Sequence, residues 1–257
     1  MINKDIFIQQ IEYDDKNKLG KIYDKIILCN KINTVVYTNE FYPPNVWKVI
    51  QDMQGELGVM VHANGVFEYA ERRIMAFSPD QVWDYPIDIL CIESKSNFTN
   101  LSHRDYMGAI MVLGINREKF GDIVLADDKC YVAIDENLTE YIIDNIKAIG
   151  KSPCAVSKLD KYFHSLPQYS FEDKNIIVSS MRIDCIVSSL TNLSRNKVME
   201  FFKSGKVLLN YITVKDKDKI VKNQSIITIR GYGKFKLVEE IGYTGSGRIK
   251  VLFKKFN

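Results

Sequence analysis

The sequence predicts an α+β protein built from three units, and three observations lead to this expectation. The chain has 257 residues, more than one small core requires, and 46% of them are hydrophobic. Apolar residues recur at helical spacing in some segments and alternate or cluster as in strands in others. Positive charge is concentrated after residue 180. We expect an N-terminal α/β domain over residues 1–80, a middle domain over 81–165, a linker over 166–180 and a C-terminal domain over 181–257.

The composition argues against several classes of protein. No stretch approaches the roughly 18 to 20 apolar residues that a membrane-spanning helix needs. The five cysteines include no CxxC pair, which argues against a zinc knuckle and against a disulfide framework. The three histidines lie in different elements without the spacing of metal ligands. We therefore expect a cytoplasmic monomer that contains no metal and no cofactor.

Residues 1–80 are predicted to combine helices with short strands. One apolar helical face is formed by Ile22, Tyr23, Ile26 and Ile27. The other elements expected here are a strand at Thr34–Thr38, a helix at Val46–Met53 and a strand at Leu57–His62. This segment contains no motif to which chemistry can be assigned.

The middle domain is predicted to follow the order β-α-β-β-α-β. Its second helix is expected from about Leu138 to Gly150, with Asn137 as N-cap and Glu140 completing a capping box. The remaining elements are strands at Ile87–Ile92, Asp122–Ala126, Tyr131–Ile134 and Cys154–Lys158, and a helix from Ser102 to Leu113. This order is the ferredoxin-like arrangement that RNA-recognition domains share. The strands carry few aromatic residues on which bases could stack, so topology alone does not predict RNA binding.

The C-terminal domain is predicted to begin as helix, turn, helix and strand. Ser194 is placed to cap the second helix, and Ser204-Gly205 to end it. The apolar face of the first helix consists of Ile183, Ile186, Val187 and Leu190. Strands are expected at Lys206–Asn210, Ile226–Arg230, Lys234–Glu240 and Arg248–Phe253.

The charge of this domain is its most informative property. Residues 181–257 contain 16 Lys and Arg against 6 Asp and Glu, a net charge of +10, whereas residues 1–180 carry 19 basic and 26 acidic residues, a net charge of −7. A small folded domain with this excess repels itself, and a polyanion is the usual partner of such a surface. RNA, DNA and an acidic membrane surface all fit, and the alternative is that the charges only keep the domain soluble.

Four ordered segments of the C-terminal domain narrow the choice; they are Met181–Asp184, Asn192–Lys197, Lys203–Val207 and Ile229–Phe235. Together they resemble the S4 RNA-binding domain, in which a helix pair and the following strand hold structured RNA. The resemblance implies RNA contacts by Arg182, Ser194, Arg195, Lys197, Lys203, Lys206, Arg230 and Lys234, with Gly205 and Gly231 setting the backbone geometry. The residues agree with it, because a helix N-terminus with an adjacent guanidinium favours an anion. One departure is Asn210-Tyr211, where S4 domains more often have Asn-Gly.

Three further segments lie upstream, at Tyr69–Arg73, His103–Ala109 and Leu113–Ile123. With the S4-like segments they are similar to the YlmH-type S4-domain proteins of Gram-positive bacteria, over most of residues 65–257. The resemblance implies an RNA-recognition-like middle domain and a C-terminal S4 domain. It also implies association with the large ribosomal subunit, rescue of stalled nascent chains and a cell-division gene neighbourhood. The implied partners are ribosomal RNA and, when peptidyl-tRNA is held on the subunit, tRNA.

Signs of catalysis are weak. His103-Arg104-Asp105 imitates the catalytic triplet of protein kinases, but the glycine-rich loop, the strand lysine and the Asp-Phe-Gly motif are missing from the sequence. We expect Arg104, Arg117 and Lys119 to contact RNA or a neighbouring domain, and surface ion pairing is an equally good interpretation.

The leading hypothesis is therefore a non-enzymatic factor that binds structured RNA on the large ribosomal subunit. A second hypothesis is an RNA-modifying enzyme, of the pseudouridine synthase or methyltransferase type, because S4 domains accompany both. The sequence contains neither a Gly-Arg-Leu-Asp motif nor a glycine-rich cofactor loop to support it. A third hypothesis is a cell-division or membrane-surface protein whose basic face contacts anionic lipid.

Overall fold

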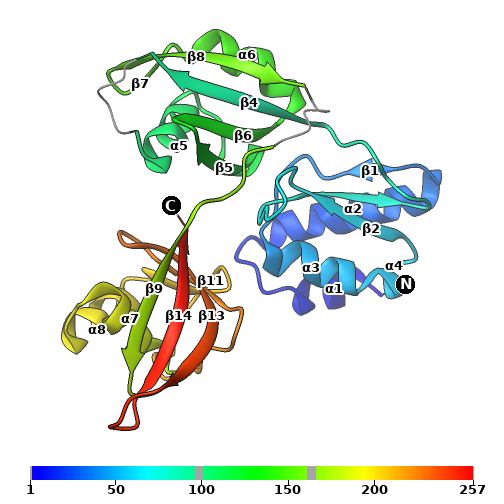
Figure 1. The fold of residues 1–257 in the computed structure, drawn as a ribbon. Coiled ribbons are helices and arrows are strands. Elements are labelled where there is room, and N and C mark those ends of the chain that lie inside the picture. The colour runs from blue at the N-terminus through cyan, green and yellow to red at the C-terminus, as the bar shows by residue number, and fades with distance from the viewer. Residues whose placement is uncertain (1, 96–100, 161–165, 257) are drawn as a thin grey trace. The chain divides into compact units, whose positions relative to one another are not determined.

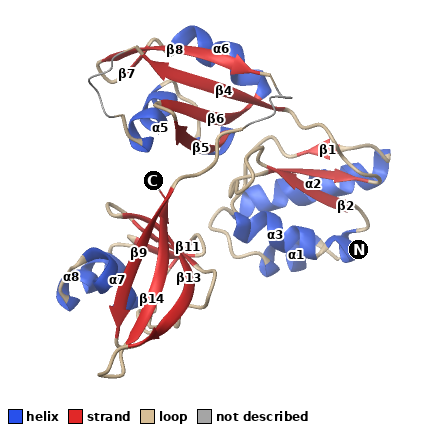
Figure 2. Ribbon diagram, in the orientation of Figure 1, coloured by secondary structure: helices blue, strands red, loops and turns tan. Residues whose placement is uncertain are grey.

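The structure is a computed structural model that describes residues 2–95, 101–160 and 166–256 (Figure 1). It divides into two compact units, Met1–Tyr169 and Ser170–Asn257. Both units combine helices with sheets, which confirms the predicted α+β class (Figure 2). None of the helices in the described ranges is long and apolar enough to cross a membrane.

Residues 4–78 of the first unit pair helices with a three-stranded antiparallel sheet of order β1-β3-β2. The long helix α2 begins after Asp15, whose side chain accepts a hydrogen bond from the Lys18 backbone N–H at 3.1 Å, and ends at Asn33 in the left-handed conformation. The strand predicted at Leu57–His62 begins later, because Gly58 ends α4 at φ 71°. The elements are α1 Lys4–Gln10, α2 Lys16–Ile32, β1 Val36–Tyr37, α3 Pro44–Asp52, α4 Gln54–Leu57, β2 Met60–Asn64 and β3 Ile74–Ser78.

Residues 87–159 form a five-stranded antiparallel sheet of order β5-β6-β4-β8-β7, and the main elements follow one another in the predicted order. The β5–β6 hairpin turns at Asp127 and Asp128, whose φ angles of 50° and 57° are those of a two-residue type I′ turn. The elements are β4 Ile87–Ser94, α5 His103–Val112, a 3₁₀ turn Arg117–Lys119, β5 Phe120–Ala126, β6 Lys129–Asp135, a 3₁₀ turn Glu136–Leu138, α6 Thr139–Asn145, β7 Ala148–Ile149 and β8 Ser152–Leu159.

The helix α6 differs from its prediction at both ends. Asn137 is not the N-cap, because its backbone N–H and its side-chain amide both donate to Asp135, at 3.1 and 2.9 Å. The chain therefore makes a 3₁₀ turn first, and α6 begins only at Thr139. The helix ends at Asn145 rather than at Gly150, because the following residues pair with β8 and Gly150 occupies the turn of that hairpin at φ 58°.

The two faces of the five-stranded sheet are covered by different parts of the first unit. Leu90 and Ile92 of β4 pack with α5 and α6, whereas Ile87 and Ile89 point to the opposite face, as strand alternation requires. On that opposite face they join a buried cluster with residues that come from the N-terminal segment. The cluster consists of Phe41, Phe67, Ala70, Ile74, Ala76, Tyr85, Ile87, Ile89, Val124 and Ala133. Residues 1–80 and 81–165 thus share a core.

The second unit is a six-stranded antiparallel sheet of order β11-β10-β12-β13-β14-β9, with α7 and α8 packed on one face (Figure 2). Val251 and Phe253 of β14 are fully buried beneath the helices, and the intervening positions face away from them. The elements are β9 Phe171–Val178, α7 Ile183–Thr191, α8 Arg195–Lys203, β10 Val207–Leu209, β11 Ile212–Thr213, β12 Ile226–Ile229, β13 Gly233–Tyr243 and β14 Ile249–Phe256.

The prediction of a linker over 166–180 is wrong for its central part. Phe171–Val178 forms β9, which pairs with β14 along its whole length from Phe171↔Phe256 to Val178↔Ile249. Ile176 and Val178 enter the core, but residues 172–175 stay exposed because β9 is an edge strand. The polar residues of this segment give no local signal for a strand, and the strand forms through pairing with the distant β14.

Candidate nucleic-acid interface

The helix pair α7–α8 forms the corner of the candidate interface. Asn192 ends α7 in the left-handed conformation at φ 55°, and the Ser188 hydroxyl donates to the Leu193 carbonyl at 2.7 Å. Ser194 is the N-cap residue of α8, as predicted, but its hydroxyl makes no capping hydrogen bond. Ser194 thus does not cap the first backbone N–H groups of α8, which lie at the positive end of the helix dipole.

Four of the predicted RNA-contacting residues are exposed cations on α8 or directly after it. They are Arg195, Lys197, Lys203 and Lys206. Val198 and Phe202 form the apolar side of α8 and are buried in the core of the unit. Lys197 and Lys203 lie on other sides of the helix, whereas Arg195 is in line with Val198 and Phe202 and is exposed because it stands at the first turn.

Backbone hydrogen bonds bring the last two basic segments together. The Lys206 N–H donates to the Phe201 carbonyl at 2.9 Å, and the Arg230 N–H donates to the Lys206 carbonyl at the same distance. Glycines permit this route, since Gly205 has φ 62° and Gly231 has φ 97°, both in the left-handed region. Lys206 and exposed Arg230 consequently lie side by side although distant in sequence.

Arg182 is placed differently from the other predicted contacts. Its guanidinium donates to both carboxylate oxygens of Asp184, at 3.1 and 2.8 Å, and also pairs with Asp218. Burial alone would raise the pKa of Asp184, but the hydrogen bonds from Arg182 and from the Cys185 backbone outweigh it and the pKa lies below its ordinary value. In the free protein Arg182 therefore fixes the start of α7 against the segment that contains Asp218.

Lys234 is also separated from the group around α8. It is paired with Thr228 in the sheet and lies on the face opposite Phe235, which is buried beneath the helices. Its ammonium is 4.9 Å from the centre of the Phe256 ring and 5.9 Å from that of Tyr211. The structure thus brings most of the predicted residues to the helical side and leaves Lys234 on the helix-free side.

One cation that the sequence analysis did not single out belongs to the interface. Arg248 and Arg195 line a hollow of about 300 Å³ between α7, the end of β9 and the start of α8. Three serine side chains, Ser179, Ser188 and Ser189, line it as well. Asp184 is the acidic residue in this lining, and its charge is already paired with Arg182. The sequence predicts a strand at Arg248–Phe253, but no local pattern indicates that Arg248 and Arg195 line the same hollow.

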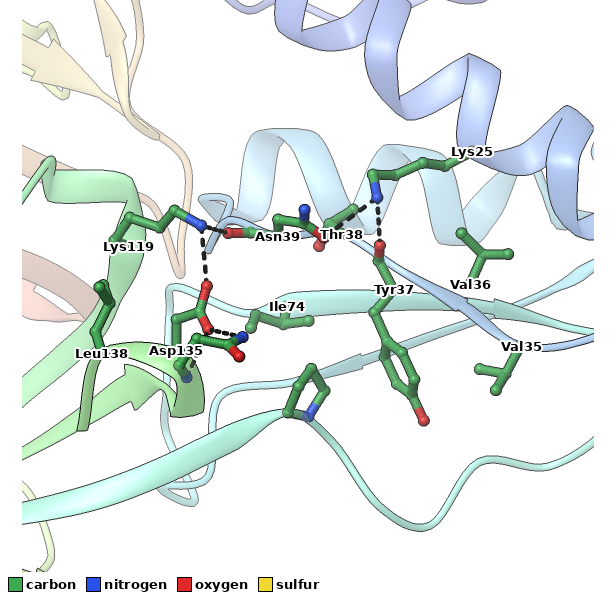
Figure 3. Close-up of a pocket in the computed structure, with 12 residues that line it drawn as sticks. Lys25, Val35, Val36, Tyr37, Thr38, Asn39, Ile74, Lys119, Asp135 and Leu138 are labelled. Atoms are coloured by element: carbon green, nitrogen blue, oxygen red, sulfur yellow. Dashed lines mark hydrogen bonds and ion pairs between the residues drawn. The ribbon is translucent and has the colours of Figure 1, made fainter. Parts of the chain in front are cut away.

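The candidate residues of the first unit are mostly engaged within that unit. The half-buried Arg117 side chain donates to the carbonyls of Phe120 and Gly121 at 2.6 and 3.0 Å, and partial burial lowers the pKa of its guanidinium to about 10. Lys119 donates to Asp135 at 2.9 Å and to the Asn39 carbonyl at 2.8 Å (Figure 3). Both interactions fix the start of β5, and Lys119 links it to the N-terminal segment. Arg104, on α5, is exposed.

A second hollow, of about 510 Å³, lies beside Lys119 (Figure 3). Lys25 enters it from α2 and donates to the Tyr37 carbonyl at 2.8 Å and to the Asn39 side chain at 3.2 Å. Burial lowers the pKa of Lys25, and the positive charge of Lys119 lowers it further. Since both ammonium groups already have oxygen partners, this hollow is a joint between segments rather than an open anion site.

Three comparisons relate the chain to known proteins. A family model described as "Putative RNA-binding domain in YlmH" matches residues 79–162. The chain is 26% identical over 220 residues to "Ribosome-associated protein quality control protein P2" of Bacillus subtilis (strain 168), a match that covers 84% of this chain and 86% of the relative. The solved structure titled "Cell division protein ylmH from Streptococcus pneumoniae" superimposes with a TM-score of 0.48 and 18% identity, over 58% of this chain and 94% of that one.

Proposed function

We propose that this chain, which is a YlmH-type protein, is a ribosome-associated RNA-binding factor whose C-terminal unit holds structured RNA in the manner of an S4 domain. The observation that carries the proposal is the meeting of α8, β10 and the β12–β13 turn, where exposed Lys203, Lys206 and Arg230 gather. The relative from Bacillus subtilis is named for ribosome-associated quality control, which is the setting we propose for this chain.

The chemistry of the interface favours recognition of RNA shape. Exposed lysine and arginine side chains contact phosphates, which position the nucleic acid without reading its sequence. Arg195 and Arg248 line one hollow, and we assign to them a single phosphate held from both sides. A rigid basic surface of this kind suits folded ribosomal RNA of the large subunit and the backbone of tRNA. The role that follows is binding by a cytoplasmic monomer, with no catalytic step.

The middle domain takes a different role in this proposal. In an RNA-recognition domain the sheet face without helices stacks the bases. Here part of that face is packed against Phe41, Phe67 and Tyr85, and the Arg117 guanidinium is bound to backbone carbonyls at the start of β5. This packing supports placing the principal RNA surface in the C-terminal unit and treating the middle domain as a scaffold that also presents the exposed Arg104.

Ribosome co-sedimentation of the full chain tests the proposal. The variant R195A/K197A removes two exposed charges from α8, and K21A/K31A removes two exposed charges from α2 as a matched control. R195A/K197A should no longer sediment with ribosomes, although its circular dichroism spectrum should show that it remains folded. The control K21A/K31A should sediment with ribosomes as the unmodified protein does. Undiminished sedimentation of folded R195A/K197A would overturn the proposal.

A further inference from the structure

An aromatic pair lies inside the basic surface of the C-terminal unit. The rings of Phe201, on α8, and Tyr232, in the β12–β13 turn, meet edge to face with centroids 5.8 Å apart. Phe201 is half-buried against the core, whereas Tyr232 is 39% exposed. The pair thus has a fixed inner ring and an accessible outer ring.

The β12–β13 turn fixes the position of Tyr232. The Tyr232 N–H donates to the Ile229 carbonyl at 2.9 Å, and Tyr232 stands between Gly231 at φ 97° and Gly233 at φ 134°. Residues with a side chain rarely adopt such backbone angles, so the tight turn depends on both glycines. A ring held on a rigid turn loses little conformational freedom when a flat ligand stacks on it.

Cations flank this pair. The Lys206 ammonium is 5.2 Å from the centre of the Phe201 ring, and Arg230 precedes Gly231 directly in the same turn. A second aromatic pair in this unit, Phe171 and Phe256, lies where the edge strand β9 pairs with its neighbour β14. Only at Phe201 and Tyr232, among the ring pairs of residues 166–256, do the rings adjoin the backbone junction of Lys206 and Arg230.

We infer that Tyr232 stacks an unpaired base of the bound RNA, while Lys206 and Arg230 hold the phosphates on either side of that nucleotide. The inference rests on the proposed function and adds the class of RNA to it: a folded RNA with a bulged or looped-out nucleotide rather than an unbroken duplex. A nucleobase has a flat π-face that an exposed aromatic ring can cover, and stacking of this kind tolerates any base.

The test compares two RNA hairpins that have the same loop and differ by one nucleotide in the stem. One stem carries a single bulged 2-aminopurine, whose fluorescence is quenched by stacking, and the other stem is fully paired. The unmodified full chain should bind the bulged hairpin more tightly and quench its fluorescence. Y232L should weaken binding of the bulged hairpin by about 5- to 150-fold, the range that loss of one base–aromatic stack gives, and should abolish the quenching. Y232F, which keeps the ring, should behave as the unmodified protein.

Two controls separate this inference from the proposed function. Y141L removes an exposed tyrosine of α6, in the other unit, and should change neither affinity nor fluorescence. Y232L should keep the salt dependence of binding, whereas R230A should lower its slope by about 0.7 to 0.9, the share of one phosphate. Equal binding of both hairpins with an unaffected Y232L would overturn the stacking inference and leave RNA binding standing. Absence of salt-dependent binding to either hairpin would instead contradict the proposed function.

Discussion

Arg195 and Arg248 provide a test of how the basic surface holds a phosphate. Both line the same hollow of about 300 Å³, so a phosphate bound there contacts both guanidinium groups. A hydrogen bond between charged groups contributes about 1.5 to 3 kcal/mol, and the low end applies because both side chains are exposed in the free protein. R195A and R248A should each weaken RNA binding about tenfold.

The double variant separates a shared phosphate from two independent ones. Two arginines that hold one phosphate act together, so R195A/R248A should lose clearly less than the roughly hundredfold product of the single losses. The slope of log affinity against log salt should fall by about 0.7 to 0.9, the contribution of one phosphate. Fluorescence anisotropy with a labelled RNA hairpin over a series of salt concentrations measures both quantities. If the double variant loses the full product of the two single losses in affinity, and the salt slope falls by twice the amount expected for one phosphate, the two arginines do not share a phosphate.

Two further predictions concern stability. Tyr211 has φ 72° in the β10–β11 turn, a backbone conformation that costs less for glycine than for tyrosine. Y211G should therefore raise the free energy of unfolding by about 0.5 to 1 kcal/mol, which is the cost of the left-handed backbone less the extra entropy that glycine loses on folding. A lower free energy of unfolding in urea would show that packing of the Tyr211 ring near Lys234 outweighs the backbone cost. Burial alone would raise the pKa of Asp135, but hydrogen bonds from Lys119 and Asn137 bring it below its ordinary value. The stability that the ionised Asp135 carboxylate contributes is therefore complete above about pH 4 and is lost as the pH falls through the folded-state pKa of this group. D135N should be destabilised at neutral pH and should lose less stability on acidification, and parallel acid titrations of the two proteins would contradict this account.

Local signals in the sequence predicted most of the elements of the fold correctly. The start of α8 after Ser194 and its end at Ser204-Gly205 depend on neighbouring residues, and the structure has both. Two different causes explain the failures. Asn137 has the side chain of a cap, but Asp135, only two residues earlier, accepts its hydrogen bonds. The segment Phe171–Val178 becomes a strand because the distant β14 is available to pair with it.

The candidate site shows the same division. The resemblance to S4 domains assigned RNA contacts to Arg195, Lys203 and Lys206, and the structure has all three exposed on α8 or in the segment that follows it. The proximity of Arg248 to Arg195 depends on how β14 returns along the sheet, which no local pattern reveals. Tyr232 carried no signal beyond its flanking glycines, since contact with Phe201 requires the tertiary fold.

The middle domain shows why the order of elements does not by itself assign an RNA surface. Its elements occur in the β-α-β-β-α-β order of RNA-recognition domains, and the matched family model is described as RNA-binding. Nevertheless Ile87 and Ile89, on the face without helices, are buried by residues of the N-terminal segment. A sheet face can serve as an interface between segments or as a platform for bases, and the packing decides which.

Crosslinking the full chain to RNA in cells with ultraviolet light, followed by mass spectrometry of the crosslinked peptides, locates the residues that contact RNA. We expect these residues to lie on α8, at the start of β10, in the β12–β13 turn, with Tyr232 prominent, and beside Arg248. Crosslinks confined to residues 79–162, with none in Ser170–Asn257, would contradict this expectation.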